Sequence, residues 1–202
     1  RQAQMIDDLL DVSRIVSGKL SLDTQRVSLV SVIDDAVASA RPAADAKGVR
    51  LTMTGGNADV NGDRARLQQM IWNLVNNAIK FTSRDGIVTV SLHVVDDSVH
   101  IDVIDDGQGI APDLLPHIFE RFQQGDSSST RRHGGLGLGL AIVKNLAEVH
   151  GGSVQAASAG AGRGATFTVV LPLIRSAHER RPEPADASAR SKALLADVVV
   201  MV

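Results

Sequence analysis

The stretch RARLQQMIWNLVNNAIKF, residues 64–81, decides the fold. Its apolar residues recur at the three- and four-residue steps of one helix face: Leu67, Met70, Ile71, Leu74, Val75, Ala78 and Ile79. This periodicity predicts an α-helix over residues 64–81 with one buried face. Asp63 stands directly before the helix and is its expected N-cap, because a short carboxylate side chain accepts hydrogen bonds from the free amides of a first helical turn.

A polar stripe lies beside the buried face of this helix. At about 100° per residue, Arg66, Asn73, Asn77 and Lys80 fall within one narrow band. An Asn carbonyl is a hard oxygen ligand, and a Lys ammonium is a compact charge for phosphate, so the stripe suits a hydrated magnesium-phosphate group. The alternative is a solvated polar face, and on this helix alone that alternative is favoured.

The flanking segments predict a mixed α and β architecture. Before the helix we expect a strand at 27–29, a helix at 31–46 that Ser31 caps and Pro42 bends or shortens, and a strand at 49–54. After it, the alternating residues 87–95 and 99–104 flank the turn Asp96-Asp97-Ser98 and predict a hairpin. Further along we expect a short helix at 112–119, a helix ending at 151–152, and a hairpin of residues 154–157 and 165–171.

Two glycine-rich strings follow predicted elements at positions suited to a ligand. DDGQGI, residues 105–110, ends a strand, where a carboxylate can accept a hydrogen bond from an adenine amine. GGLGLGL, residues 134–140, enters a helix, so its amides form an anion-favouring helix N-terminus. It is neither a P-loop nor a dinucleotide fingerprint, because no GK[ST] follows it and no βαβ unit surrounds it. An ordinary turn and a flexible hinge are the alternatives for the two strings.

Together these strings resemble, in order and spacing, the catalytic domain of sensor histidine kinases, a branch of the ATPase superfamily that includes DNA gyrase, heat-shock chaperones and MutL proteins. The resemblance covers residues 27–172. It implies an α+β fold: a two-layer α/β sandwich of the Bergerat type, with a mixed, mostly antiparallel sheet covered by helices on one face. The strings are the asparagine box NLVNNAIKF (73–81), the glycine boxes DDGQGI (105–110), GLGLGL (135–140) and GRGATF (162–167), and the phenylalanine box FERF (119–122).

The resemblance implies a site for ATP and Mg²⁺. Asn77 would coordinate the magnesium, Asn73 would support it, and Lys80 would contact the phosphates, so these three are the expected catalytic residues. Asp105 would hold the adenine amine, and Thr166 would support the network around it. The other expected ATP-binding residues are Phe81, Gly107, Gly109, Ile110, Phe119, Arg121, Gly135, Leu136, Gly137, Leu138, Gly139 and Leu140.

Residues 123–139 resemble the ATP lid, whose polar residues and glycines suit a loop that orders on nucleotide binding. Arg121, Arg131 and Arg132 are alternative contacts of the γ-phosphate, and the sequence does not choose among them.

Position 73 separates two chemistries of the superfamily. The hydrolysing relatives carry a Glu there, one helical turn before Asn77, and that Glu activates water. Asn73 is an amide without a basic lone pair, so water attack would lack its general base. The sequence therefore indicates phosphoryl transfer to a histidine, for onward relay to a response-regulator aspartate. The alternatives are an ATP hydrolase of the heat-shock chaperone or MutL type and a nucleotide-binding module without catalysis.

The resemblance also divides the chain into three segments. Residues 1–22 look like the end of the second helix of a dimerisation and histidine-phosphotransfer module, residues 23–173 like the ATP-binding domain, and residues 174–202 like a linker with the truncated start of a receiver domain. None of the six histidines carries the acceptor pattern, so we expect the phosphoacceptor outside this chain and no autophosphorylation by the chain alone. The expected partners are the missing acceptor helix, a receiver domain and a second copy in a full-length homodimer.

The composition fits a soluble domain and excludes some classes. The 21 basic and 23 acidic residues are interspersed and sum to a net charge of -2, so no basic field favours nucleic acid. Without cysteine there are no disulfides or thiolate metal sites, which agrees with a reducing compartment. No apolar run approaches the roughly 20 residues that span a bilayer. We expect a cytoplasmic domain of a parent that is either cytoplasmic or membrane-anchored.

Overall fold

The computed structural model describes residues 21–121 and 137–174. The segments predicted to form an N-terminal helix, nearly all of the lid and a receiver-like strand fall outside these ranges. The predictions made for those segments, including the roles of Gly135, Leu136, Arg131 and Arg132, therefore stay predictions.

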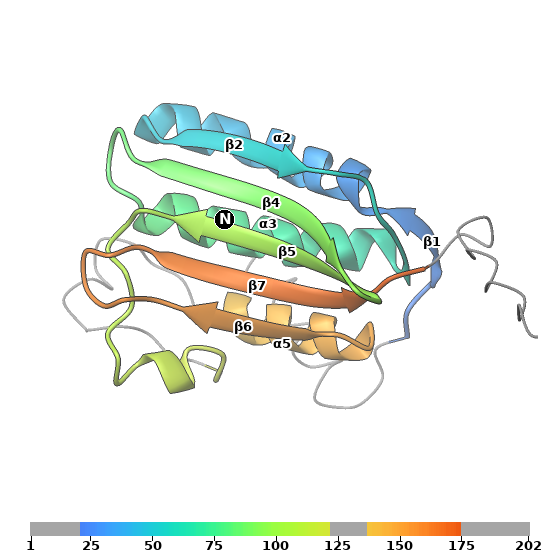
Figure 1. The fold of residues 1–202 in the computed structure, drawn as a ribbon. Coiled ribbons are helices and arrows are strands. Elements are labelled where there is room, and N and C mark those ends of the chain that lie inside the picture. The colour runs from blue at the N-terminus through green and yellow to red at the C-terminus, as the bar shows by residue number, and fades with distance from the viewer. Residues whose placement is uncertain (1–20, 122–136, 175–202) are drawn as a thin grey trace, which may run out of the picture.

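A five-stranded sheet forms one layer of the domain (Figure 1). Its strands lie in the order β2 (Arg50–Gly55), β4 (Ile87–Val95), β5 (Ser98–Asp105), β7 (Ala165–Pro172) and β6 (Ser153–Ala157). Strand β2 pairs with β4 in parallel, and the other neighbours are antiparallel. The expected mixed, mostly antiparallel sheet is confirmed. A small antiparallel ribbon beside it joins β1 (Gln25–Ser28) to β3 (Asp59–Gly62).

Helices form the second layer. Figure 1 shows that they all lie on the same face of the sheet: α2 (Leu29–Lys47), α3 (Arg64–Phe81) and α5 (Gly139–Val149). A short 3₁₀ helix, η1 (Leu115–His117), lies between β5 and α5 in the sequence. The two-layer sandwich with helices on one face is thus confirmed.

The core lies between the two layers. The side chains of β4 and β5 alternate between the two faces of the sheet. Val90, Ile101 and Val103 point toward the helices and are fully buried. The apolar face of α3 meets them, with Met70 and Leu74 also fully buried. Because each such side chain contributes roughly 1.5–3 kcal/mol on burial, this contact fixes the rotation of α3 about its axis. The polar stripe of α3 is thereby held at the edge of the core.

The predicted bounds of α3 are confirmed, as is its cap. The Asp63 carboxylate Oδ1 accepts hydrogen bonds from the amides of Ala65 at 3.0 Å and Arg66 at 3.2 Å. The start of α2, however, was predicted wrongly. Ser28, in extended backbone, is the N-cap residue in place of Ser31, and the Ser31 hydroxyl donates back to the Ser28 carbonyl at 2.9 Å.

Helix α2 also continues through Pro42 to Lys47, so the proline does not shorten it. The lost hydrogen bond is tolerated because Ala40 and Ala44, on either side of the proline, are buried in the core. The helix expected at 112–119 is reduced to η1, where Pro116 lacks a backbone donor. Strand β3 was not predicted.

Candidate nucleotide-binding site

The polar side of α3 meets the start of α5. A Cβ added at Gly139 would lie 3.9 Å from Asn73 Oδ1 and 4.0 Å from Asn77 Nδ2, so both amide groups face the first turn of α5. Asn73 is 7% exposed, and its Nδ2 is a buried nitrogen with no hydrogen-bond partner among the described residues. Buried amide donors are almost always paired, so this nitrogen calls for an acceptor that the described residues do not supply.

The N-terminus of α5 adds a favourable environment for anions at the same place. The first amides of a helix lack intrahelical acceptors and carry the positive end of the helix dipole. Gly137, with a φ of 69°, leads into the helix, and Leu138 directly before it is 2% exposed in the core. Leu138 and the half-buried Leu140 anchor this first turn, whereas Gly139 leaves the space beside the two asparagines open.

The C-terminal end of α3 presents Lys80 and Phe81. The Lys80 ammonium lies 4.8 Å from the centre of the Phe81 ring, and burial lowers its pKa from the ordinary value of a lysine. The carbonyls that end α3 are capped by a residue that the sequence did not indicate. Lys47 of α2 donates through its Nζ to the carbonyls of Ile79 at 2.8 Å and Lys80 at 2.6 Å.

Asp105 is the last residue of β5 and is 8% exposed. Desolvation raises the pKa of its carboxyl, hydrogen bonds from the backbone of Gly107 and Ala165 act in the opposite direction, and the nearby Asp106 raises the pKa further. The Gly107 amide donates to Asp105 Oδ1 at 2.9 Å. Asp106 has a structural role, because its Oδ1 accepts from the Ile87 amide at 2.8 Å and ties the loop to β4.

The glycine loop after Asp105 is packed against the end of α3. The Gln108 amide donates to the Phe81 carbonyl at 3.1 Å, and a Cβ at Gly107 would collide with that same carbonyl oxygen. The loop therefore approaches the helix backbone too closely for any side chain at position 107. This contact joins the Asp105 end of the site to the Lys80 end.

The glycine-rich segment between β6 and β7 supports the loop from its other side. Gly109 has a φ of 68°, and a Cβ there would collide with the Gly160 carbonyl. The Ile110 amide donates at 3.0 Å to the hydroxyl of Ser158, which itself donates to the Gly164 carbonyl at 2.7 Å. Sequence reasoning missed Ser158, since a serine in a Gly/Ser-rich turn gives no signal of this contact.

Thr166, which is expected to support the network around Asp105, does not lie opposite that residue. In the register of β5 and β7, Ala165 lies opposite Asp105 and Thr166 lies opposite Ile104. Successive side chains point to opposite faces of a sheet, so Thr166 shares the outer face with Ile104, which is 40% exposed. Ala165, 7% exposed, is the residue on the Asp105 side.

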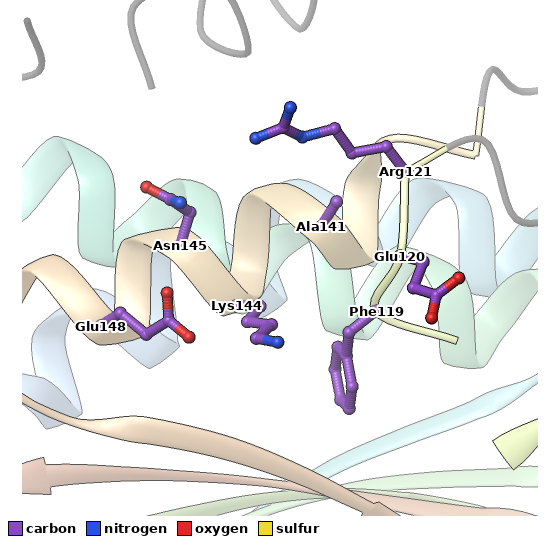
Figure 2. A pocket seen from close by; sticks show the side chains of 7 residues that line it. All are labelled: Phe119, Glu120, Arg121, Ala141, Lys144, Asn145 and Glu148. Atoms are coloured by element: carbon purple, nitrogen blue, oxygen red, sulfur yellow. The ribbon is translucent and has the colours of Figure 1, made fainter. Parts of the chain in front are cut away.

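Phe119 and Arg121 lie apart from the two asparagines. They line a cavity of about 440 Å³ with Glu120 and the outer residues of α5, namely Ala141, Lys144, Asn145 and Glu148 (Figure 2). Figure 2 shows Phe119 pointing toward the sheet, where its ring meets Phe167 edge-on at 6.3 Å, and Arg121 pointing the other way. The asparagines instead approach α5 at Gly139. The two residues therefore belong to a neighbouring pocket across α5.

These contacts define a class of domain. In a two-layer α/β sandwich, two amides meet a helix N-terminus, and a lysine and a buried carboxylate lie at the end of the helix that carries the amides. These are groups of the kind that bind a nucleotide. The particular family follows from comparison with known proteins.

The profile of the family described as histidine kinase-, DNA gyrase B-, and HSP90-like ATPases matches residues 62–175, and the chain belongs to this family. The chain is 38% identical over 207 residues to hybrid signal transduction histidine kinase D of Dictyostelium discoideum. That alignment covers 86% of this chain and 13% of the relative. The chain spans between 13% and 46% of the length of the first relatives that it matches.

Solved structures agree with this assignment. The mycobacterial sensor histidine kinase MprB superposes with a TM-score of 0.68 at 29% identity, over 76% of this chain and 99% of that one. Full-length ShkA in complex with AMPPNP superposes with a TM-score of 0.75 at 30% identity, over 86% of this chain and 36% of that one. The chain is accordingly an ATP-binding catalytic domain of the sensor histidine kinase type, with the Bergerat fold.

Proposed function

We propose that this domain binds ATP with Mg²⁺ and transfers the γ-phosphate to a histidine on a dimerisation helix outside this chain, for relay to a response-regulator aspartate. The observation that carries the proposal is the convergence of Asn73 and Asn77 on the N-terminus of α5, with the Asn73 nitrogen buried and unpaired among the described residues. This arrangement supplies donors, an oxygen ligand and a positive dipole at one point.

The residues at this point suit magnesium better than a metal that needs an all-protein cage. In the described part of the chain, no group of three or more His, Cys, Asp or Glu side chains could hold a metal ion. Magnesium is commonly held by few protein oxygens and by substrate phosphates, and it keeps several waters. The Asn77 side-chain oxygen would be the protein ligand, with Asn73 supporting it. When bound, the ion would neutralise charge on the phosphates.

At the other end of the site, Asp105 would accept a hydrogen bond from the adenine amine. Its carboxylate is already oriented by the backbone amides of Gly107 and Ala165, so little side-chain freedom is lost on binding. Gly109 and Ile110 would border the base. Lys80, at the end of α3, would contact the phosphates, where a lysine acts as a compact positive charge.

The residue at position 73 favours transfer over hydrolysis. An amide at this position cannot take a proton from water, whereas an imidazole nitrogen attacks through its own lone pair and needs no general base. The new P–N bond would form as the bond from the γ-phosphorus to the bridging oxygen breaks and ADP leaves. Arg131 and Arg132 remain the alternative contacts of the γ-phosphate, because Arg121 lines the neighbouring pocket across α5.

The proposal includes the partners and the setting. Among the described histidines, His93 and His100 lie on the outer face of the sheet, opposite the helices, His117 lies in η1, and His150 lies at the end of α5. We therefore place the acceptor histidine in a separate helix that pairs with a second copy. No helix in the described ranges has the length and apolar character to cross a membrane. We place the domain in the cytoplasm, with residues 174–202 leading into a receiver domain.

The test is phosphotransfer in trans. The chain is incubated with Mg-ATP labelled on the γ-phosphate and a fragment that carries an acceptor helix, and acid-labile, alkali-stable phosphate is measured on the fragment. Asn77→Ala should abolish the signal, and Gln68→Ala, on the same helix but away from the polar stripe, should retain it. Steady release of free phosphate without an acceptor would favour the hydrolase, and no Mg-ATP binding would favour the module without catalysis.

A further inference from the structure

His150 joins the far ends of the two helices that form the phosphate side of the site. It is the C-cap residue of α5 and is 8% exposed. Its Nδ1 lies 2.7 Å from the Leu146 carbonyl oxygen of the same helix, and its Nε2 lies 3.1 Å from the backbone amide of Asp63, the N-cap of α3.

The two partners fix the protonation of the ring. A carbonyl oxygen only accepts, so Nδ1 must carry a proton, and a backbone N–H only donates, so Nε2 must be unprotonated. The bridge therefore requires the neutral imidazole with its proton on Nδ1. The surroundings also fix the ring position, because a Cβ at Gly62 would lie 2.8 Å from His150 Cδ2 and 2.9 Å from Leu67 Cδ1.

Asp63 links the contact with His150 to two other parts of the domain. Its carboxylate caps the first turn of α3, and the other carboxylate oxygen accepts from the Asp23 amide at 3.2 Å, where the chain enters the domain. The backbone of the same residue donates to His150. The start of α3, the end of α5 and the entering chain thus meet at one residue.

The lengths of α3 and α5 relate the His150–Asp63 hydrogen bond to the position of the nucleotide site. Helices α3 and α5 make two identified contacts, Asp63 with His150 and the amides of Asn73 and Asn77 with Gly139. At about 1.5 Å per residue, Asp63 and Asn73 are roughly 15 Å apart along α3, and Gly139 and His150 are roughly 16 Å apart along α5. The two helices run in opposite directions, so fixing one end of the pair fixes how far the start of α5 reaches along α3.

We propose that His150, as a neutral imidazole that accepts from the Asp63 amide, is a positioning residue that sets the axial register of α5 on α3 and so places the α5 N-terminus beside Asn73 and Asn77. The affinity test of this inference rests on the proposed function, because its readout is the binding of Mg-ATP. The ring does not touch the nucleotide and acts through α5.

Two substitutions separate the two nitrogens of the ring. In His150→Gln the side-chain oxygen falls near the place of Nε2 and can accept from Asp63, whereas in His150→Asn the side-chain amide falls near Nδ1 and leaves Asp63 unpaired. Both variants lose packing and should melt below the unmodified chain. Because His150→Asn releases the end of α5 from α3, we expect it to weaken Mg-ATP binding by about tenfold, and His150→Gln by less than about threefold.

The experiment measures the Mg-ATP dissociation constant by calorimetry for both variants, with His100→Asn on the open sheet face as the matched control. Ring ¹⁵N NMR of the unmodified chain should show His150 protonated on Nδ1 and unprotonated on Nε2. Equal losses in the two variants, an unchanged affinity of His150→Asn, or a proton on Nε2 would each overturn the inference. Failure of the unmodified chain to bind Mg-ATP would contradict the proposed function instead, and the NMR result, which needs no nucleotide, would still decide the state of the bridge.

Discussion

The substitution Asp105→Asn tests two things separately: the stability cost of the buried carboxylate and its proposed role in binding adenine. Burial raises the pKa of Asp105, so the folded chain holds its proton more tightly than the unfolded chain does. The stability that this group contributes is fully present below the unfolded pKa, near 3.8, and is lost as the pH rises through the folded value. At neutral pH the buried charge therefore costs stability. Asn is neutral and removes that cost.

Without nucleotide, Asp105→Asn should thus melt at or above the temperature of the unmodified chain at pH 7, and this advantage should shrink as the pH falls toward 4. With nucleotide the order should reverse. A ligand at 100 times its dissociation constant stabilises the native state by about 2.7 kcal/mol. For a domain of about 150 residues each kcal/mol is worth about 2–4 °C, so Mg-ATP should raise the melting temperature of the unmodified chain by about 5–10 °C. The variant, with one amide in place of two carboxylate acceptors, should lose most of this shift.

The assay is a melting scan with and without Mg-ATP at several pH values. Asp102→Asn is the matched control: the same strand carries Asp102, but on the outer face, where it accepts from Thr168 at 2.6 Å. Its melting temperature can change, while its response to Mg-ATP should be that of the unmodified chain. If Asp105→Asn keeps the full nucleotide shift, Asp105 does not bind the base. If it melts far lower without nucleotide, the sign assigned to the buried charge is wrong.

Three further predictions follow from the contacts of the site. Lys47→Met should lower the free energy of unfolding by about 1–3 kcal/mol in urea titrations, because two carbonyls at the end of α3 lose a charged donor. Gly107→Ala should cost about 1–3 kcal/mol or more, whereas Gly139→Ala, with its nearest atom at 3.9 Å, should change stability by less than about 0.5 kcal/mol. Thr166→Val should leave the Mg-ATP dissociation constant unchanged in calorimetry, while Ala165→Val, beside Asp105, should raise it by about tenfold.

The parts of the fold that sequence predicts best are those whose signal repeats many times within one element. Helix α3 carries seven apolar residues at helical steps and an Asp cap, and its bounds are as predicted. Strand β3 is four residues long and has no repeating pattern of its own. Its partner β1 lies more than 30 residues earlier, as in the pair Val27 and Val60. A strand that forms only because a distant segment pairs with it leaves no local periodicity to read.

The same distinction applies to the site. The residues that we propose to face the nucleotide have distinctive side chains, so Asn77, Lys80 and Asp105 can be named from strings of sequence. The residues that hold them are not conspicuous: Lys47 and Ser158 act on backbone groups of segments about 30 and 50 residues away. Lysine and serine are common surface residues, and only the folded arrangement shows which carbonyl or amide each one reaches.

Thr166 shows a second limit, which comes from register. A short motif identifies the segment that passes Asp105, but a strand presents alternate residues to opposite faces, and a shift of one residue moves a side chain from the site to the outer surface. The hydroxyl of Thr166 lies on the outer face of the sheet, away from Asp105, and the methyl group of Ala165 lies on the side of the carboxylate. Asp105 is therefore oriented by backbone amides alone among its described partners. These backbone amides stay in place whichever side chain follows Gly164, so the orientation of the carboxylate depends on the β5–β7 pairing and on the glycine loop that follows Asp105.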